Sequence, residues 1–235
     1  MALICVSDKD KNINNFEYVK ITLSEVLQKT GASIDFTRSG ARQTLVVCVP
    51  DEYAQIMQSE LADKLAEIVA VNYKYNFFKS NISVSGLSKL QTEILFTALI
   101  SADFEEDKGY VFSKLKGNND LALDGAFNFQ MKPLKKKWIE IIGLIPQSFT
   151  QNQLYEFLAI LVENRRKKVY VDGGNVYDAN YRRLRRVMLL DGEEEGRIVR
   201  EIILSCGGKV EITGQLEISE EKLLSEYFCQ RISAN

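Results

Sequence analysis

The sequence predicts an α+β fold that is rich in helices. Apolar residues recur at helical spacing through most of the chain, whereas the β-branched runs that favour strands are short and lie toward its two ends. The 235 residues are 46% hydrophobic and 26% charged, which is typical of a folded protein and excludes collagen-like and low-complexity chains. We expect an N-terminal ferredoxin-like α/β unit, then further helices, and a small C-terminal β-containing unit.

The N-terminal unit is predicted from its element order, strand–helix–strand–strand–helix–strand, which is that of a ferredoxin-like module. A strand at 2–6 precedes a helix that Gly31 closes, and a hairpin follows over 32–49. Pro50 and the acidic residues after it begin a long helix. A fourth short strand is expected around 82–84.

The remainder is predicted as helices followed by a mixed segment. Helices are expected over 88–102, around 110–115, over 133–144, after Thr150, near 193–204 and over 220–231. Strands at 169–172 and 176–177 flank the turn Gly173-Gly174-Asn175, and Gly207–Gly208 is expected to end a helix before a strand at 210–213. The chain is predicted to form two units, 1–85 and 86–235, or else a single domain.

The charge is distributed unevenly along the chain. The formal net charge is −2, yet residues 132–186 include twelve basic and five acidic residues, a local balance of +7, which leaves −9 for the remainder. Such asymmetry is typical of a protein that meets an anionic partner. We therefore expect nucleic acid or another polyanion as a partner, with a protein partner or a second copy of the chain as the alternative.

The chain contains no histidine. This excludes Ser-His-Asp and Cys-His catalysis, imidazole general bases and every histidine-containing metal site. The four cysteines are too far apart in the sequence for a CxxC redox or zinc motif, so we expect buried or incidental thiols at Cys5, Cys48, Cys206 and Cys229. No catalytic residue, metal site or cofactor is predicted.

The N-terminus and the apolar runs predict the compartment. The first residues lack a basic leader with a long apolar run, and no apolar stretch reaches the roughly 20 residues that span a bilayer. We therefore expect a cytoplasmic protein with reduced cysteines and no membrane span.

The strongest candidate for a functional site is a group of closely spaced cations, for which we predict anion binding: Arg165, Arg166, Lys167, Lys168, Arg182, Arg183, Arg185 and Arg186. Tyr170, Tyr177 and Tyr181 are interleaved with them, and aromatic rings beside guanidinium groups suit single-stranded or phosphate-rich ligands. Arg182 and Arg186 would share one face of a helix at this spacing. The alternative is a solvated surface in which the cations pair with Asp178 or with the acidic residues 193–195.

Two other motifs have simpler structural interpretations. The turn at 172–175 could hold a phosphate in a nest of backbone N–H groups, but it lacks the lysine and the spacing of a P-loop, so a plain hairpin turn is favoured. The acidic run 191–195 could contribute to a magnesium site, but negative charge at the start of a helix is favoured.

The segments AFNFQMKPLKKKWIEIIGLI (126–145) and YEFLAILVENRRKKVYV (155–171), continued by REIILSCGGKVEIT (200–213), carry a family resemblance. Mostly through their apolar spacing, over about 90 residues, they resemble the sporulation protein YtxC family of endospore-forming bacteria. The resemblance implies a cytoplasmic protein of undefined activity that is connected with sporulation. It implies no catalytic or ligand-binding residue.

These observations favour a non-enzymatic binding or interaction protein whose basic segment meets an anionic partner such as nucleic acid. A protein–protein interaction scaffold is one alternative. The other is an enzyme that uses carboxylates, arginines and a divalent metal for phosphoryl transfer or hydrolysis. That alternative requires Asp172, Asp178 and Asp191 to converge.

Overall fold

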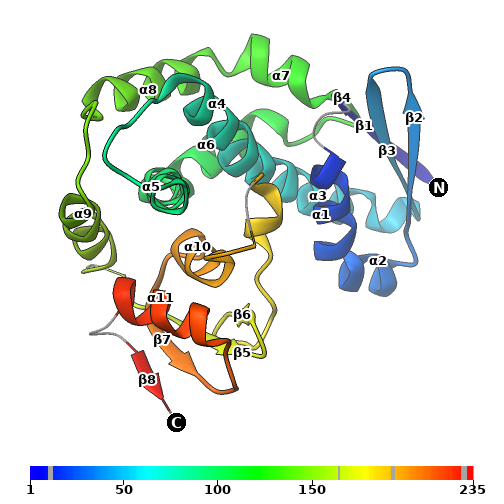
Figure 1. Cartoon of the computed structure of the whole chain (residues 1–235). Coiled ribbons are helices and arrows are strands. Elements are labelled where there is room, and N and C mark those ends of the chain that lie inside the picture. Colours follow the sequence, from blue (N-terminus) through cyan, green and yellow to red (C-terminus); the bar gives the residue numbers. More distant parts are fainter. Residues whose placement is uncertain (10–12, 164, 192–193, 229–231, 235) are drawn as a thin grey trace. The chain divides into compact units, whose positions relative to one another are not determined.

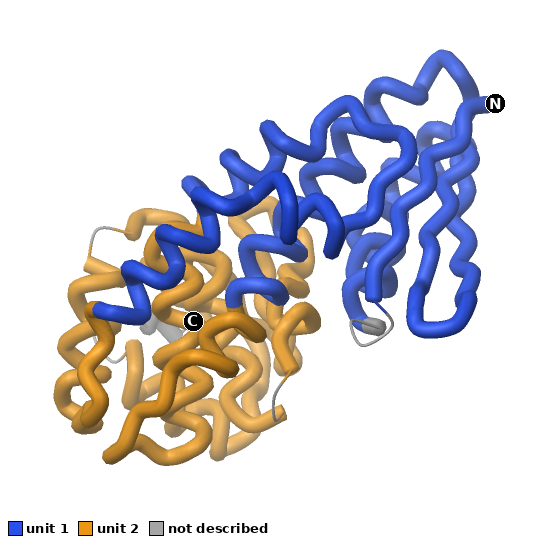
Figure 2. The backbone as a smooth tube through the Cα atoms, turned by 90° about the horizontal axis from the view of Figure 1, so that it is seen from above, with its two compact units in different colours: residues 1–74, 105–143 blue, residues 75–104, 144–235 orange. Residues whose placement is uncertain are grey.

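The computed structural model describes residues 1–9, 13–163, 165–191, 194–228 and 232–234 (Figure 1). The chain forms two compact units, one of residues 1–74 and 105–143 and the other of residues 75–104 and 144–235 (Figure 2). Each unit contains helices and a four-stranded mixed sheet, which confirms the helix-rich α+β class. Both units are discontinuous in sequence, so this division differs from the contiguous units 1–85 and 86–235.

The sheet of the first unit has the strand order β2-β3-β1-β4. Its strands are β1 (Ala2–Lys9), β2 (Ser33–Ser39), β3 (Arg42–Val49) and β4 (Asp120–Ala122). β1 and β2 both run antiparallel to β3, as the predicted hairpin and the ferredoxin-like order require. β4 runs parallel to β1 and occupies the other side of it.

The predicted fourth strand at 82–84 was wrong. Those residues form no strand, and Ser85 instead forms an isolated bridge with Ser148 in the second unit. Ser85 N donates to Gln147 O (3.0 Å), and Phe149 N donates to Ser85 O (2.9 Å). The place beside β1 belongs to β4, which follows two further helices along the chain. Because β4 has only three residues, its alternation is too short to indicate a strand.

Most helices of the first unit follow the predicted apolar periodicity. The helices of this unit are α1 (Ile13–Thr22), α2 (Ser24–Thr30), α3 (Ala54–Ile68) after the 3-10 turn Asp51–Tyr53, α6 (Phe104–Leu115), α7 (Leu123–Gln130) and α8 (Lys132–Leu144). Helix α7 was not predicted, and the helix expected before Gly31 is divided into α1 and α2. The long helix predicted after Pro50 continues from α3 through a π-helical stretch, Val69–Tyr73, into α4 (Lys74–Asn81). As predicted, Gly31 closes α2, with φ 66°.

A buried carboxylate of the first unit, Asp107, binds Lys74 and two residues of α8. Asp107 Oδ2 of α6 is 2.7 Å from Lys74 Nζ, and both side chains are almost wholly inaccessible to solvent. Asp107 also accepts hydrogen bonds from Trp138 Nε1 (2.9 Å) and Lys137 Nζ (2.8 Å), both on α8. Because removing a charge from water is costly, the carboxylate needs all of these donors.

We predict that Asp107→Leu destabilises the protein by about 3–5 kcal/mol, because the buried Lys74 ammonium group then loses its carboxylate. Urea denaturation followed by circular dichroism measures the change. Glu140→Leu is the control, since Glu140 pairs with Lys136 on the exposed surface, and it is expected to move the midpoint little. Equal midpoints for the two variants would contradict this prediction.

The second unit is built around helix α10 (Arg197–Leu204), which packs on α5, α11, the 3-10 turn η4 and strand β7. Its sheet has the order β6-β5-β7-β8, in which β5 is antiparallel to β6 and the pairs β5–β7 and β7–β8 are parallel. The strands are β5 (Lys167–Asp172), β6 (Asn175–Tyr177), β7 (Gly207–Ile212) and β8 (Ile232–Ala234). The other helical elements are α5 (Lys89–Ala102), α9 (Gln151–Glu163), η4 (Arg186–Leu189) and α11 (Ile218–Phe228).

The two glycine pairs of this unit have different roles. Gly173 and Gly174, with φ 51° and 76°, form the predicted hairpin turn between β5 and β6. The expectation that Gly207–Gly208 ends a helix was wrong, because these residues begin β7 and the left-handed residue after α10 is Cys206 (φ 59°). A Cβ on Gly208 would lie 1.9 Å from the carbonyl oxygen of Arg165, so close backbone approach requires glycine there.

The cysteines of the described ranges are free thiols of intermediate exposure: Cys5, Cys48 and Cys206. Cys229 lies outside the described residues. Among the helices that the structure describes, none combines the length and the apolar character needed to cross a membrane.

Candidate functional site

Three tyrosine rings lie together on the outer face of the sheet in the second unit. Val169 and Val171 of β5 are buried, so Tyr170 between them faces the opposite side of the sheet. Tyr177 of β6 is paired directly with Tyr170 across the strands. Tyr181 stacks on Tyr170, with ring centroids 4.5 Å apart, and its centroid is 6.3 Å from that of Tyr177.

A tight turn presents Tyr181 to solvent. Asp178 Oδ1 accepts the backbone N–H groups of Asn180 (2.8 Å) and Arg182 (2.9 Å), and Tyr181 N donates to Asp178 O (3.0 Å). Tyr181 is 58% exposed and has φ 56°, a left-handed conformation that is uncommon for a bulky residue. Strained residues of this kind cluster at functional sites, which draws attention to this ring.

Lysines flank the three rings. Lys168 and Lys209 are paired across β5 and β7, and both are exposed. Lys168 Nζ lies 4.7 Å from the ring centroid of Tyr170 and also pairs with Glu211. Glu211 is paired with Tyr170 across the same two strands, so it lies on this face and compensates the charge of Lys168. We call the surface formed by Lys168, Tyr170, Tyr177, Tyr181 and Lys209 the tyrosine face.

Two of the eight predicted cations support the fold. Arg165 donates to the carbonyl oxygens of Ile203 (2.9 Å) and Ser101 (3.1 Å), and burial lowers its pKa. Arg186 Nη1 donates to Leu204 O (3.0 Å). Because Ile203 and Leu204 end α10, these guanidinium groups satisfy carbonyls that the last turn of the helix leaves without intrahelical partners.

The other six predicted cations are accessible to solvent. Arg185 is half-buried. The other five are exposed: Arg166, Lys167, Lys168, Arg182 and Arg183. Lys168 belongs to the tyrosine face, and Arg182 directly follows its exposed ring, Tyr181. The structure therefore divides six of the eight predicted residues between the end of α10, the tyrosine face and its margin, and a pocket described below, whereas Arg166 and Lys167 are exposed outside these sites.

The expected helical face shared by Arg182 and Arg186 is absent. The backbone N–H of Leu184 donates to Val176 O (2.8 Å), and Arg183 forms an isolated bridge with Tyr177. The segment therefore runs antiparallel beside β6 before it enters η4 at Arg186. Pairing with a sheet edge has overridden the helical periodicity of the arginines.

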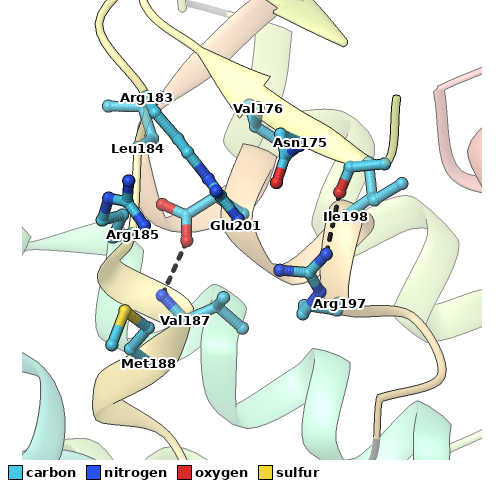
Figure 3. A pocket seen from close by; sticks show the side chains of 11 residues that line it. Asn175, Val176, Arg183, Leu184, Arg185, Val187, Met188, Arg197, Ile198 and Glu201 are labelled. Atoms are coloured by element: carbon cyan, nitrogen blue, oxygen red, sulfur yellow. Dashed lines mark hydrogen bonds between the residues drawn. The ribbon is translucent and has the colours of Figure 1, made fainter. Parts of the chain in front are cut away.

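Arg183 and Arg185 line a pocket together with Arg197 of α10 (Figure 3). The pocket is small and partly open to solvent, with a cavity volume of about 30 Å³, and its apolar lining includes Val176, Leu184, Val187, Met188 and Ile198. Arg197 Nη2 donates to Gly174 O (2.9 Å), and Arg197 Nε lies 3.3 Å from the exposed carboxylate of Glu194. Within the described part of the chain, Arg183 and Arg185 have no ion-pair partner. We call this site the arginine pocket.

The buried carboxylate of Glu201 lies between these arginines (Figure 3). It accepts the backbone N–H groups of Val187 (2.7 Å) and Arg186 (3.1 Å), which begin η4. Burial raises the pKa of Glu201. These hydrogen bonds and the nearby guanidinium groups lower the pKa, but burial has the larger effect. Burial, followed by the like charges of Arg185 and Arg197, lowers the pKa of Arg183. The arginine pocket thus brings three cations and one carboxylate together.

Sequence analysis missed three residues of these sites. Arg197 and Glu201 are four residues apart in α10, and only the packing of the segment 182–188 against that helix places them beside Arg183. Lys209 alternates with the buried Gly208 and Val210 along β7. Strand periodicity could have found Lys209, whereas nothing in the sequence relates α10 to the arginines before it.

The carboxylates that the enzyme alternative requires have separate local roles. Asp178 holds the turn before Tyr181, whereas the exposed Asp191 pairs with Lys79 (3.5 Å). Asp172 is exposed at the end of β5. The described residues include no group of three or more cysteine, aspartate or glutamate side chains that could hold a metal ion.

Comparisons with known proteins give no assignment. No family model matches the chain, and no match is found among curated proteins or solved structures. The resemblance to the YtxC family therefore stays a prediction, and the role of the site is argued from its geometry.

We predict that Glu201 makes the stability of the protein depend on pH. Its pKa is raised in the folded state, so the folded protein binds this proton more tightly than the unfolded chain does. Stability is therefore expected to fall as pH rises above the ordinary glutamate pKa toward the raised value, by at most about 1.4 kcal/mol per pH unit.

Urea denaturation over a pH series, with wild type and Glu201→Gln compared, measures this contribution. The Gln variant is expected to lose that part of the slope, whereas Glu221→Gln, at an exposed position of α11, is expected to keep it. Parallel pH profiles for wild type and Glu201→Gln would contradict the prediction.

Proposed function

We propose that the protein is a cytoplasmic, non-enzymatic binding protein that holds single-stranded nucleic acid on the tyrosine face. The observation that carries this proposal is the stack of the exposed Tyr181 ring on Tyr170. The ammonium groups of Lys168 and Lys209 lie beside these rings on the same sheet. On the resemblance to the YtxC family, we further propose that this role belongs to endospore formation.

Stacking favours a single strand over a duplex. Bases of a single strand are free to lie on aromatic rings, and each stacked base contributes about 1–3 kcal/mol. In a duplex the base faces are already stacked on one another and are closed to Tyr181. The turn that Asp178 holds fixes the ring before binding, so less conformational entropy is lost when a base arrives.

The cations near the rings suit the phosphates of such a strand. Lys168 and Lys209 lie on the face itself, and Arg182 directly follows Tyr181 in the turn. Neutralising phosphates releases condensed counterions, so affinity depends on salt. With three such contacts on a single strand, log K is expected to fall with log salt with a slope of about −2.

Exposed apolar side chains support the protein-interaction alternative, and Leu3 is one of them. Leu3 is 59% exposed on the face of the first sheet opposite the buried Ile4 and Val6, with Cys48 as its directly paired neighbour. This apolar surface is small, and isolated exposed apolar side chains of this kind are common on protein surfaces. The stacked and charged tyrosine face is the more specific arrangement, and we favour it.

We predict that Tyr181→Ala weakens the binding of a fluorescein-labelled (dT)20 or (U)20 strand by about 5- to 150-fold, because it removes a stacking platform. Fluorescence anisotropy at low and raised salt measures both the affinity and the salt slope. Tyr110→Ala is the matched control, since Lys114 lies over that ring in the first unit, 5.6 Å from its centroid, and this variant is expected to bind like wild type.

Three outcomes would contradict this proposal. One is the absence of binding to either strand at low salt. The second is an equal loss for Tyr181→Ala and Tyr110→Ala. The third is tighter binding to a DNA duplex than to (dT)20, which would indicate backbone recognition without stacking.

A further inference from the structure

The arginine pocket concentrates positive charge that the described side chains do not neutralise. Arg183 lines the pocket together with Arg185 and Arg197, and burial followed by the like charges of these two residues disfavours its charged form. Arg197 has Gly174 O and the exposed Glu194 as partners, whereas Arg183 and Arg185 have no ion-pair partner among the described residues. An anion entering the pocket would relieve this repulsion.

Glu201 does not take the place of that anion. Its two carboxylate oxygens accept the backbone N–H groups of Arg186 and Val187, and neither oxygen forms an ion pair with Arg183, Arg185 or Arg197. With Glu201 ionised, the three guanidinium groups and one carboxylate that line the pocket sum to +2, and the exposed Glu194 pairs with one of these guanidinium groups, that of Arg197. A bound group of one to two negative charges would balance the remaining positive charge.

We propose that the arginine pocket binds a terminal phosphate, a phosphomonoester at one end of the strand that the tyrosine face holds. A phosphomonoester carries about −1.5 to −2 charges at neutral pH and has three free oxygens, which suit several guanidinium groups at once. A phosphodiester inside a strand has one charge and two free oxygens, so it matches the pocket less well.

One short segment connects the tyrosine face with the pocket, although none of the three tyrosines lines the pocket itself. Arg183 forms its bridge with Tyr177 and is two residues from Tyr181, so the stacked rings and the guanidinium groups share the same edge of the sheet. A strand whose last bases stack on the rings can therefore place its end in the pocket.

The inference rests on the proposed function and is tested by comparing three (dT)10 strands, labelled through an internal base. One carries a 5′-phosphate, one a 3′-phosphate and one neither. Fluorescence anisotropy on the wild-type protein is expected to show about tenfold tighter binding for one of the two phosphorylated strands, and the arm that gains identifies the end. Equal affinities for all three strands would overturn the inference and leave the proposed function intact.

Variants locate the effect. Arg185→Gln and, independently, Arg183→Gln are expected to remove the gain from the phosphate while binding the unphosphorylated strand nearly as wild type does. Arg166→Gln, at an exposed position outside the pocket, is expected to keep the gain. Circular dichroism establishes that each variant is folded. A gain that survives in both pocket variants would overturn the inference, and the absence of binding to any strand would overturn the proposed function with it.

Discussion

The burial of α10 is the constraint on which the second unit depends. A helix of eight residues is too short to be stable by itself in water, so tertiary packing must stabilise it. Its apolar residues are all buried: Ile198, Val199, Ile202, Ile203 and Leu204. A helix end buried in this way needs partners for its free carbonyl groups, and Arg165 and Arg186 provide them. The positive charge of both residues also opposes the negative end of the helix dipole.

The same helix decides where positive charge remains available. Glu201 faces the start of η4 and accepts its first N–H groups, which fixes the path of the segment that carries Arg183 and Arg185. Arg197, one turn earlier, completes the arginine pocket. The local excess of charge counted along the sequence is thus larger than the charge presented to a partner. Part of it stabilises α10, and part lies on the tyrosine face and in the arginine pocket.

In the first unit, several charged side chains are paired with residues of opposite charge. Lys108 Nζ lies 2.8 Å from Asp63 and 2.9 Å from Glu67, and the buried Lys74 meets Asp107. Arg42 Nη2 is likewise 2.6 Å from Asp124 Oδ1, and this pairing raises the pKa of Arg42. These pairs hold helices and strands together within the unit. They contrast with the arginines 183 and 185, whose charges no described carboxylate balances at ion-pair distance.

The sequence by itself determined the elements whose signals are local. The helical periodicity after Pro50, the glycine turn at 173–174 and the hairpin over 32–49 depend on neighbours a few residues away, and all three are present. The eight candidate cations were also identified from sequence, together with the tyrosines between them. Local signals suffice there because side-chain spacing and positive φ are properties of short segments.

Only the tertiary structure decided which partners those elements have. β4 pairs with β1 across more than a hundred residues, and the segment at Arg183 joins the edge of β6 instead of continuing a helix. The division of the arginines between the end of α10 and an open pocket follows from the same packing. Long-range pairing depends on which faces of helices and strands are buried together. The spacing of residues along the chain does not reveal this. The sequence therefore contains the charges, and the fold determines which of them can meet a ligand.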